Sequence, residues 1–164
     1  EENLEPGGIL SHKTITKAGK EALYLFCETS YNPKNTKSVK HIKMNGRKVY
    51  EFAISNIPGA LKKCLEDSGK NIDDVKKIFL HQANEKLDEA VLKYFYKQFN
   101  KEIPENIMPI SVDIYGNSSV ATIPTLYDEV LKTKFKGHNL KKGDVILFAS
   151  VGAGMNINAL TYQL

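Results

Sequence analysis

Cysteine is scarce in this sequence: only Cys27 and Cys64 occur among 164 residues. Two cysteines in unlike contexts do not make a disulfide framework, which indicates a reducing, cytoplasmic setting. No apolar run approaches the ~18 residues that a membrane-spanning helix needs, and no signal-peptide pattern is present. The sequence begins Glu1-Glu2-Asn3 rather than with methionine, as expected of a domain cut from a longer protein.

Basic residues are in only small excess over acidic ones. The 23 basic and 19 acidic residues give a net charge of +4, which permits an acidic partner but is below that of a typical nucleic-acid binder. The histidines show no metal-ligand spacing with one another or with cysteine, so no metal site is expected; they are His12, His41, His81 and His138. The composition, 41% hydrophobic and 26% charged, is that of an ordinary globular domain.

The pattern of apolar residues and turn signals predicts alternating strands and helices. In the first part we expect two strands, over 8–16 and 21–27, around a turn, and then a surface loop over 31–43. A helix is predicted from Tyr50 to Ser68, kinked or restarted at Pro58 and ended by Gly69. A short strand over 75–80 follows.

The second part has the clearest periodicity. Asn84 is expected to cap a helix whose apolar residues share one face: Leu87, Ala90, Val91, Tyr94 and Phe95. A short strand over 107–114 broken by Pro109, a helix after Gly116, a buried strand over 145–151 and a returning strand over 155–164 complete the pattern. This order predicts an α/β domain: a layered mixed β-sheet with helices on its faces and a C-terminal β-hairpin. Residues 1–43 lead into a main domain at 44–164.

Polar or glycine-rich segments follow three predicted strands: His81, Asn117 and the turn 152–154. In open α/β sheets, ligands bind where the carboxyl ends of strands meet, so a shared site is plausible. Each feature alone also has a structural interpretation, as a hydrogen-bonded histidine, a turn or cap asparagine, and a hairpin turn. Cys64 lies on an apolar helix face as core, and no base lies beside Cys27 in the sequence.

Four segments taken together resemble a known family. His81-Gln82-Ala83-Asn84 is followed by YGNSSVATIP at 115–124, GDVIL at 143–147 and Gly-Ala-Gly at 152–154. This series resembles the C-terminal half of the β-ketoacyl-acyl-carrier-protein synthase III family, the condensing enzymes of the thiolase fold. Met44-Asn45-Gly46 and the helix after it are similar as well, so the resemblance covers 44–164 closely and 1–43 loosely.

The resemblance implies decarboxylative condensation. In that family a cysteine takes an acyl group from acyl-CoA, and a histidine and an asparagine bind the malonyl thioester on the acyl carrier protein. These positions match His81 and Asn117, whose imidazole and amide can donate hydrogen bonds to an enolate without adding a formal charge. The backbone N–H of Ala153 matches a second oxyanion donor. No cofactor is implied, because the substrates carry CoA or phosphopantetheine themselves.

The resemblance also implies substrate and carrier contacts. Asn84 and Lys86 match positions near the phosphopantetheine arm. Lys93 matches a basic position that faces the acidic carrier. Arg47 lies in the segment that contacts the CoA end of the ligand. Two departures stand out: Val151 replaces a phenylalanine of many members, and Glu51 replaces a basic carrier-facing residue.

The family's nucleophilic cysteine belongs to the N-terminal half, and neither cysteine of this sequence lies in a matching context. We therefore expect a C-terminal half that needs a separate Cys-bearing N-terminal half, is inactive alone, and belongs to a homodimeric 3-oxoacyl-[acyl-carrier-protein] synthase III of fatty-acid synthesis. One alternative is a polyketide- or resorcinol-type condensing enzyme of the same family. Another is a non-catalytic carrier-docking domain, against which the presence of both His81 and Asn117 weighs. The half-enzyme interpretation predicts an open apolar face.

Overall fold

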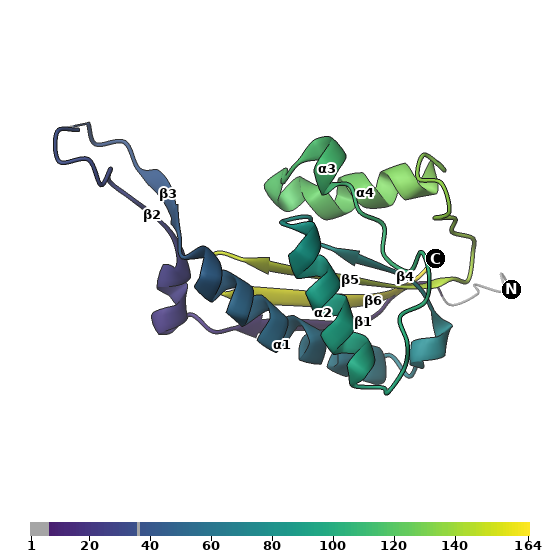
Figure 1. The fold of residues 1–164 in the computed structure, drawn as a ribbon. Coiled ribbons are helices and arrows are strands. Elements are labelled where there is room, and N and C mark those ends of the chain that lie inside the picture. The colour runs from purple at the N-terminus through teal and green to yellow at the C-terminus, as the bar shows by residue number, and fades with distance from the viewer. Residues whose placement is uncertain (1–6, 36) are drawn as a thin grey trace, which may run out of the picture.

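A mixed four-stranded sheet is the centre of the computed structural model, which describes residues 7–35 and 37–164 (Figure 1). Its order is β1 (Gly8–Thr16), β6 (Asn156–Gln163), β5 (Val145–Gly152) and β4 (Val75–Leu80). β4 and β5 are parallel, while β6 pairs antiparallel with both β5 and β1. The predicted mixed sheet and C-terminal hairpin are confirmed.

The sheet separates two apolar cores because successive side chains of a strand point to opposite faces. Ile78 and Leu147 belong to the larger core, which packs against α1 (Gly46–Asp67) and α2 (Glu85–Lys97). Their neighbours Phe79 and Ile146 belong to the smaller core, which packs against α4 (Thr122–Leu131). Since β4 and β5 are covered on both faces, the apolar runs at 78–80 in β4 and 145–149 in β5 are explained.

The first helix departs from the prediction at its start and at Pro58. Asn45 caps α1 by accepting a hydrogen bond from the Lys48 N–H, so the helix begins at Gly46 rather than at Tyr50. Pro58 lies inside one uninterrupted helix, and its ring is buried among the apolar residues of that face. Tertiary packing of a long apolar face offsets the loss of one helical hydrogen bond. The helix ends as predicted, with Gly69 at a φ of +71°.

The N-terminal prediction is partly wrong. β1 pairs with β6 rather than with residues 21–27, where a 3-10 helix (Lys20–Tyr24) leads into β2 (Leu25–Glu28). β2 pairs with β3 (His41–Met44), which was expected to lie in a loop, and the two strands project from the body of the molecule (Figure 1). The partner of β1 is distant in the sequence, so local pattern could not reveal it.

The strand predicted over 107–114 is also wrong. An irregular segment lies there, followed by the short helix α3 (Val112–Tyr115). The segment still runs beside β4, since the Ile78 N–H donates to the Ile107 carbonyl. Pro109 has no N–H to give to a ladder, which accounts for the irregular backbone.

The remaining helices begin where polar residues precede them. Asn84 caps α2 as predicted by accepting from the Leu87 N–H. Two further 3-10 turns occur, Ile72–Asp74 before β4 and Ser119–Ala121 before α4. Within the described residues, no helix combines the length and hydropathy needed to cross a membrane.

Candidate functional site

His81 follows the carboxyl end of β4 directly. Its backbone N–H donates to the Ala149 carbonyl of β5 at 3.0 Å, which fixes the residue at the sheet edge. Its side chain is half-buried, and Nδ1 lies 2.6 Å from the Thr122 hydroxyl oxygen at the start of α4. Burial lowers the pKa of the imidazole below its usual 6.5, so the ring is neutral at pH 7.

Asn117 lies in the loop between α3 and α4, with an exposed side chain. Its Oδ1 accepts a hydrogen bond from the Ser119 N–H at 2.9 Å. Ser119 has a φ of +59°, a left-handed conformation that brings its peptide back toward Asn117. Because Oδ1 is engaged, Nδ2 is the group that this amide can offer to a ligand.

A short chain of polar contacts connects these two residues. The Thr122 hydroxyl contacts His81 and also lies 3.0 Å from the Ser119 carbonyl, while the N–H of Ser119 binds Asn117. Ser119, in the 3-10 turn before α4, and Thr122, the first residue of α4, therefore contact both predicted site residues. The structure thus links His81 and Asn117 although 36 positions separate them in the sequence.

Gln82 is a structural partner that the sequence analysis gave no role. Its side chain is fully buried; Oε1 accepts from the Ser111 N–H at 2.8 Å and Nε2 donates to the Leu80 carbonyl at 3.0 Å. It thus ties the end of β4 to the segment that leads to Asn117. Gln82, Ser119 and Thr122 all lie inside the two motif segments, 81–84 and 115–124, which was the available signal.

Ala153 lies in the turn after β5, at the same sheet edge as His81 because β4 and β5 are parallel. Asn156 Nδ2 donates to the Ala153 carbonyl at 2.7 Å. Gly154 has a φ of +76°, and a Cβ there would lie 2.9 Å from Asn156 Nδ2. The positive φ therefore favours glycine at 154, and Asn156 holds the Ala153 carbonyl in place.

The predicted carrier-contact residues are all exposed, and they divide between two helices. Lys86 and Lys93 lie on α2, as does the cap Asn84, whose Oδ1 is engaged by the helix and whose Nδ2 is left for a ligand. Arg47 lies on α1, and its Nε donates to Glu51 at 2.9 Å. Hydrogen bonds from Lys48 and Arg47 lower the pKa of the Glu51 carboxyl.

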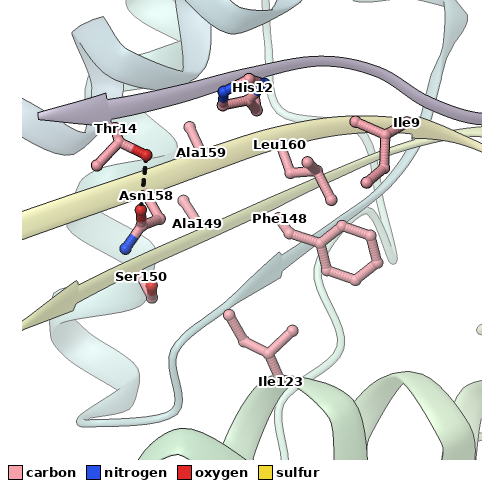
Figure 2. A pocket seen from close by; sticks show the side chains of 10 residues that line it. All are labelled: Ile9, His12, Thr14, Ile123, Phe148, Ala149, Ser150, Asn158, Ala159 and Leu160. Carbon is pink, nitrogen blue, oxygen red and sulfur yellow. Dashed lines mark hydrogen bonds between the residues drawn. The ribbon is translucent and has the colours of Figure 1, made fainter.

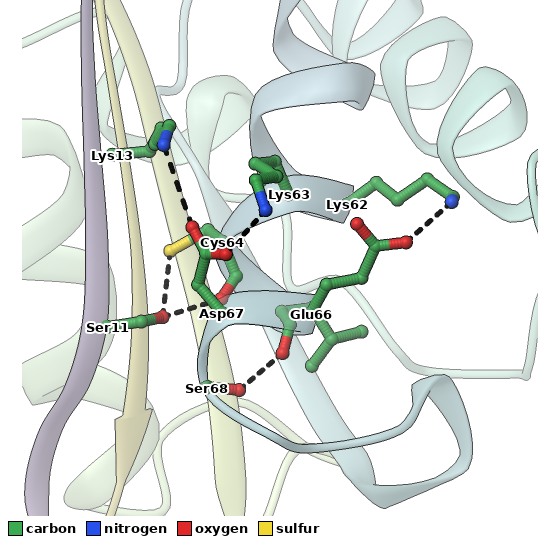
Figure 3. A network of polar contacts seen from close by, with 9 residues as sticks. Ser11, Lys13, Lys62, Lys63, Cys64, Glu66, Asp67 and Ser68 are labelled. Carbon is green, nitrogen blue, oxygen red and sulfur yellow. Dashed lines mark hydrogen bonds and ion pairs between the residues drawn. The ribbon is translucent and has the colours of Figure 1, made fainter.

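Neither cysteine lies in this site. Cys64 is fully buried, with Sγ 3.2 Å from the Ser11 hydroxyl, between α1 and β1 (Figure 3). Cys27 is exposed on β2, in the projecting two-stranded sheet. Among the residues that the structure describes, no three His, Cys, Asp or Glu side chains are grouped to hold a metal ion.

An open groove of about 380 Å³ lies on the sheet beside α4 (Figure 2). Ile123 of α4 and Phe148 of β5 form one side, and β6 and β1 form the floor and far side. Ile9 lies at one end of this groove, and its side chain is 65% exposed. Whereas α4 covers β4 and β5, this part of the same face has no covering helix among the described residues (Figure 1).

Comparison with known proteins places this geometry in a family. The model of the 3-oxoacyl-[acyl-carrier-protein (ACP)] synthase III C-terminal family matches residues 65–164. The chain belongs to this family. A β-ketoacyl-[acyl-carrier-protein] synthase III from Porphyra umbilicalis is 37% identical over 122 residues, which are 74% of this chain and 34% of that protein.

Solved structures extend the similarity to nearly the whole chain. A β-ketoacyl-[acyl carrier protein] synthase III from Thermus thermophilus superimposes with a TM-score of 0.79 at 26% identity, covering 98% of this chain and 47% of that one. The priming β-ketosynthase of the R1128 polyketide pathway shares the fold, with a TM-score of 0.80 at 20% identity and coverage of 97% and 45%. The predicted thiolase-like half is confirmed, and the chain spans between a third and a half of these relatives' length.

Proposed function

We propose that this chain is the C-terminal half of a 3-oxoacyl-[acyl-carrier-protein] synthase III, which condenses an acyl-CoA primer with malonyl-acyl-carrier protein. The observation that carries the proposal is the polar chain that joins His81 to Asn117 in a member of this family. Loss of CO₂ from a malonyl thioester leaves an enolate oxygen that needs hydrogen-bond donors already in place. The His81 imidazole and the Asn117 amide are such donors.

The acylation half of the reaction needs a cysteine from elsewhere. Cys64 is fully buried between α1 and β1, and Cys27 lies on the projecting strands, outside the polar chain that joins His81 to Asn117. The relatives are about twice as long as this chain, and we propose that their remaining half corresponds to the Cys-bearing partner. The Ala153 N–H would then serve the acyl-cysteine thioester.

The apolar groove beside α4 supports such a partner. Its lining residues Ile123, Phe148 and Leu160 are of the kind that pack against another protein surface. The exposed basic residues Lys86 and Lys93 would attract an acidic carrier protein. Arg47 would attract the phosphates of CoA. Acyl-chain preference depends on the other half as well, so a polyketide-type condensing enzyme, whose fold this chain shares, is the second candidate.

The test is decarboxylation of malonyl-acyl-carrier protein by the full-length gene product. His81→Ala and Asn117→Ala should each lower the rate by about 10²–10³, the usual cost of removing one preorganised donor. The matched controls are His41→Ala, at an exposed position on β3, and Asn32→Ala, at an exposed position in the loop between β2 and β3. Unchanged rates in both site variants would reject catalysis and favour a domain that only docks the carrier.

A further inference from the structure

Thr122 is the side chain that holds the His81 ring. It is the first residue of α4 and is 4% exposed. Its hydroxyl oxygen lies 2.6 Å from His81 Nδ1 and 3.0 Å from the Ser119 carbonyl oxygen. A hydroxyl has one proton, so two arrangements fit these distances: Thr122 donates to the Ser119 carbonyl and accepts from Nδ1–H, or it donates to an unprotonated Nδ1.

Two features favour donation to His81. The 2.6 Å separation is shorter than the roughly 2.7–3.2 Å of N–H···O bonds and lies within the range of hydroxyl donors. The Ser119 carbonyl, in turn, already accepts the backbone N–H of Thr122. The carbonyl therefore keeps a partner when the hydroxyl proton is given to an unprotonated Nδ1.

We propose that Thr122 is a positioning residue, which donates its hydroxyl proton to His81 Nδ1 and so keeps the ring proton on Nε2. This inference rests on the proposed function, because the tautomer matters only if Nε2–H is a donor to the enolate. Burial keeps the ring neutral, so one nitrogen alone carries a proton. Without the hydroxyl, part of the population carries it on Nδ1 and presents a lone pair to the developing oxyanion.

The same segment orients both proposed donors, His81 and Asn117. Ser119 fixes the Asn117 amide through its N–H, and its carbonyl receives the backbone N–H of Thr122. One turn of chain thus sets which atom each side chain can donate from: Nδ2 of Asn117 and Nε2 of His81. The 3-10 turn and the start of α4 are therefore part of the site, although neither Ser119 nor Thr122 needs to touch substrate.

The direct test is ¹⁵N NMR of the full-length protein with labelled histidine, with the His81 signals assigned by their loss in His81→Gln. We expect a protonated Nε2 and an unprotonated Nδ1 in the wild type at pH 7. Thr122→Val should give a mixture of both tautomers, and Thr122→Ser should restore the wild-type pattern. A wild-type ring protonated on Nδ1 would overturn the proposal, whatever the enzyme's activity.

Kinetics gives a second, independent readout. Thr122→Val should lower kcat for malonyl decarboxylation roughly 10- to 100-fold, less than loss of the whole donor, with KM nearly unchanged. Thr122→Ser should recover most of that loss, and the exposed Thr125→Val on the same helix is the matched control. Wild-type kcat in Thr122→Val would reject the positioning role if His81→Ala is inactive. Wild-type kcat in His81→Ala would instead reject the proposed function.

Discussion

Asp88 is the least expected residue of α2. It is 3% exposed, and its Oδ2 has no hydrogen-bond partner. Burial, with a smaller contribution from the nearby Glu85, raises the pKa of this carboxyl to about 8. The group is therefore protonated in the native state at neutral pH but ionised in the unfolded chain.

This difference predicts a pH-dependent stability. Between about pH 4 and pH 8 the native state binds the proton that the unfolded state releases, so stability falls as pH rises through that window. Asp88→Asn should remove that slope, which amounts to a few kcal/mol over the whole window. Denaturant midpoints measured from about pH 5 to pH 8 provide the check, with the exposed Asp113→Asn as control. Parallel curves for wild type and Asp88→Asn would contradict the assignment.

At the scale of elements, Gln82 joins β4 to the segment before α3. Gln82→Leu would leave the Ser111 N–H and the Leu80 carbonyl without their partner, at a cost of about 1–3 kcal/mol for each buried group. We expect a lower urea midpoint together with faster amide exchange at Ser111. Gln98→Leu is the control, because its single bond to the Tyr94 carbonyl is exposed. Unchanged exchange at Ser111 would show that other contacts hold the segment.

The sequence predicts the elements whose signals are local. Asn84 and Gly69 mark helix ends through their own caps, and the apolar run 145–151 is a buried strand whatever its neighbours are. The pairing of β1 with β6 depends on contacts between opposite ends of the chain, and the loss of the strand at 107–114 depends on Pro109 at the sheet edge. Neither the strand pairing nor the missing strand can be predicted from the periodicity of apolar residues alone.

For the site, the residue types were predictable and their connections were not. Motif resemblance identifies His81 and Asn117, but the bonds that orient them involve Thr122 and Ser119. Those bonds depend on a left-handed residue, Ser119 at φ +59°, and on where α4 begins. Nothing in the composition of GNSSVAT predicts that serine, rather than glycine, takes this conformation.

At the scale of the whole molecule, the groove beside α4 leads to a prediction about assembly. Ile9→Lys should leave the fold of this chain intact, since Ile9 is 65% exposed. It should weaken co-purification with a co-expressed N-terminal half, because a lysine would then be buried against apolar side chains. Val39→Lys, at a residue 55% exposed outside the groove, is the control. Equal recovery of the partner with both variants would place the contact elsewhere.

The pairing of β1 with β6 has a consequence for the order of synthesis. Thr16 hydrogen-bonds through its hydroxyl to Asn156, 140 positions later. On the ribosome, β1 is made first of these strands and has no sheet to join until the last hairpin emerges. Contacts so distant in the chain slow folding and leave strand edges open to aggregation in the meantime. This half should therefore depend on chaperones during translation more than its small size suggests.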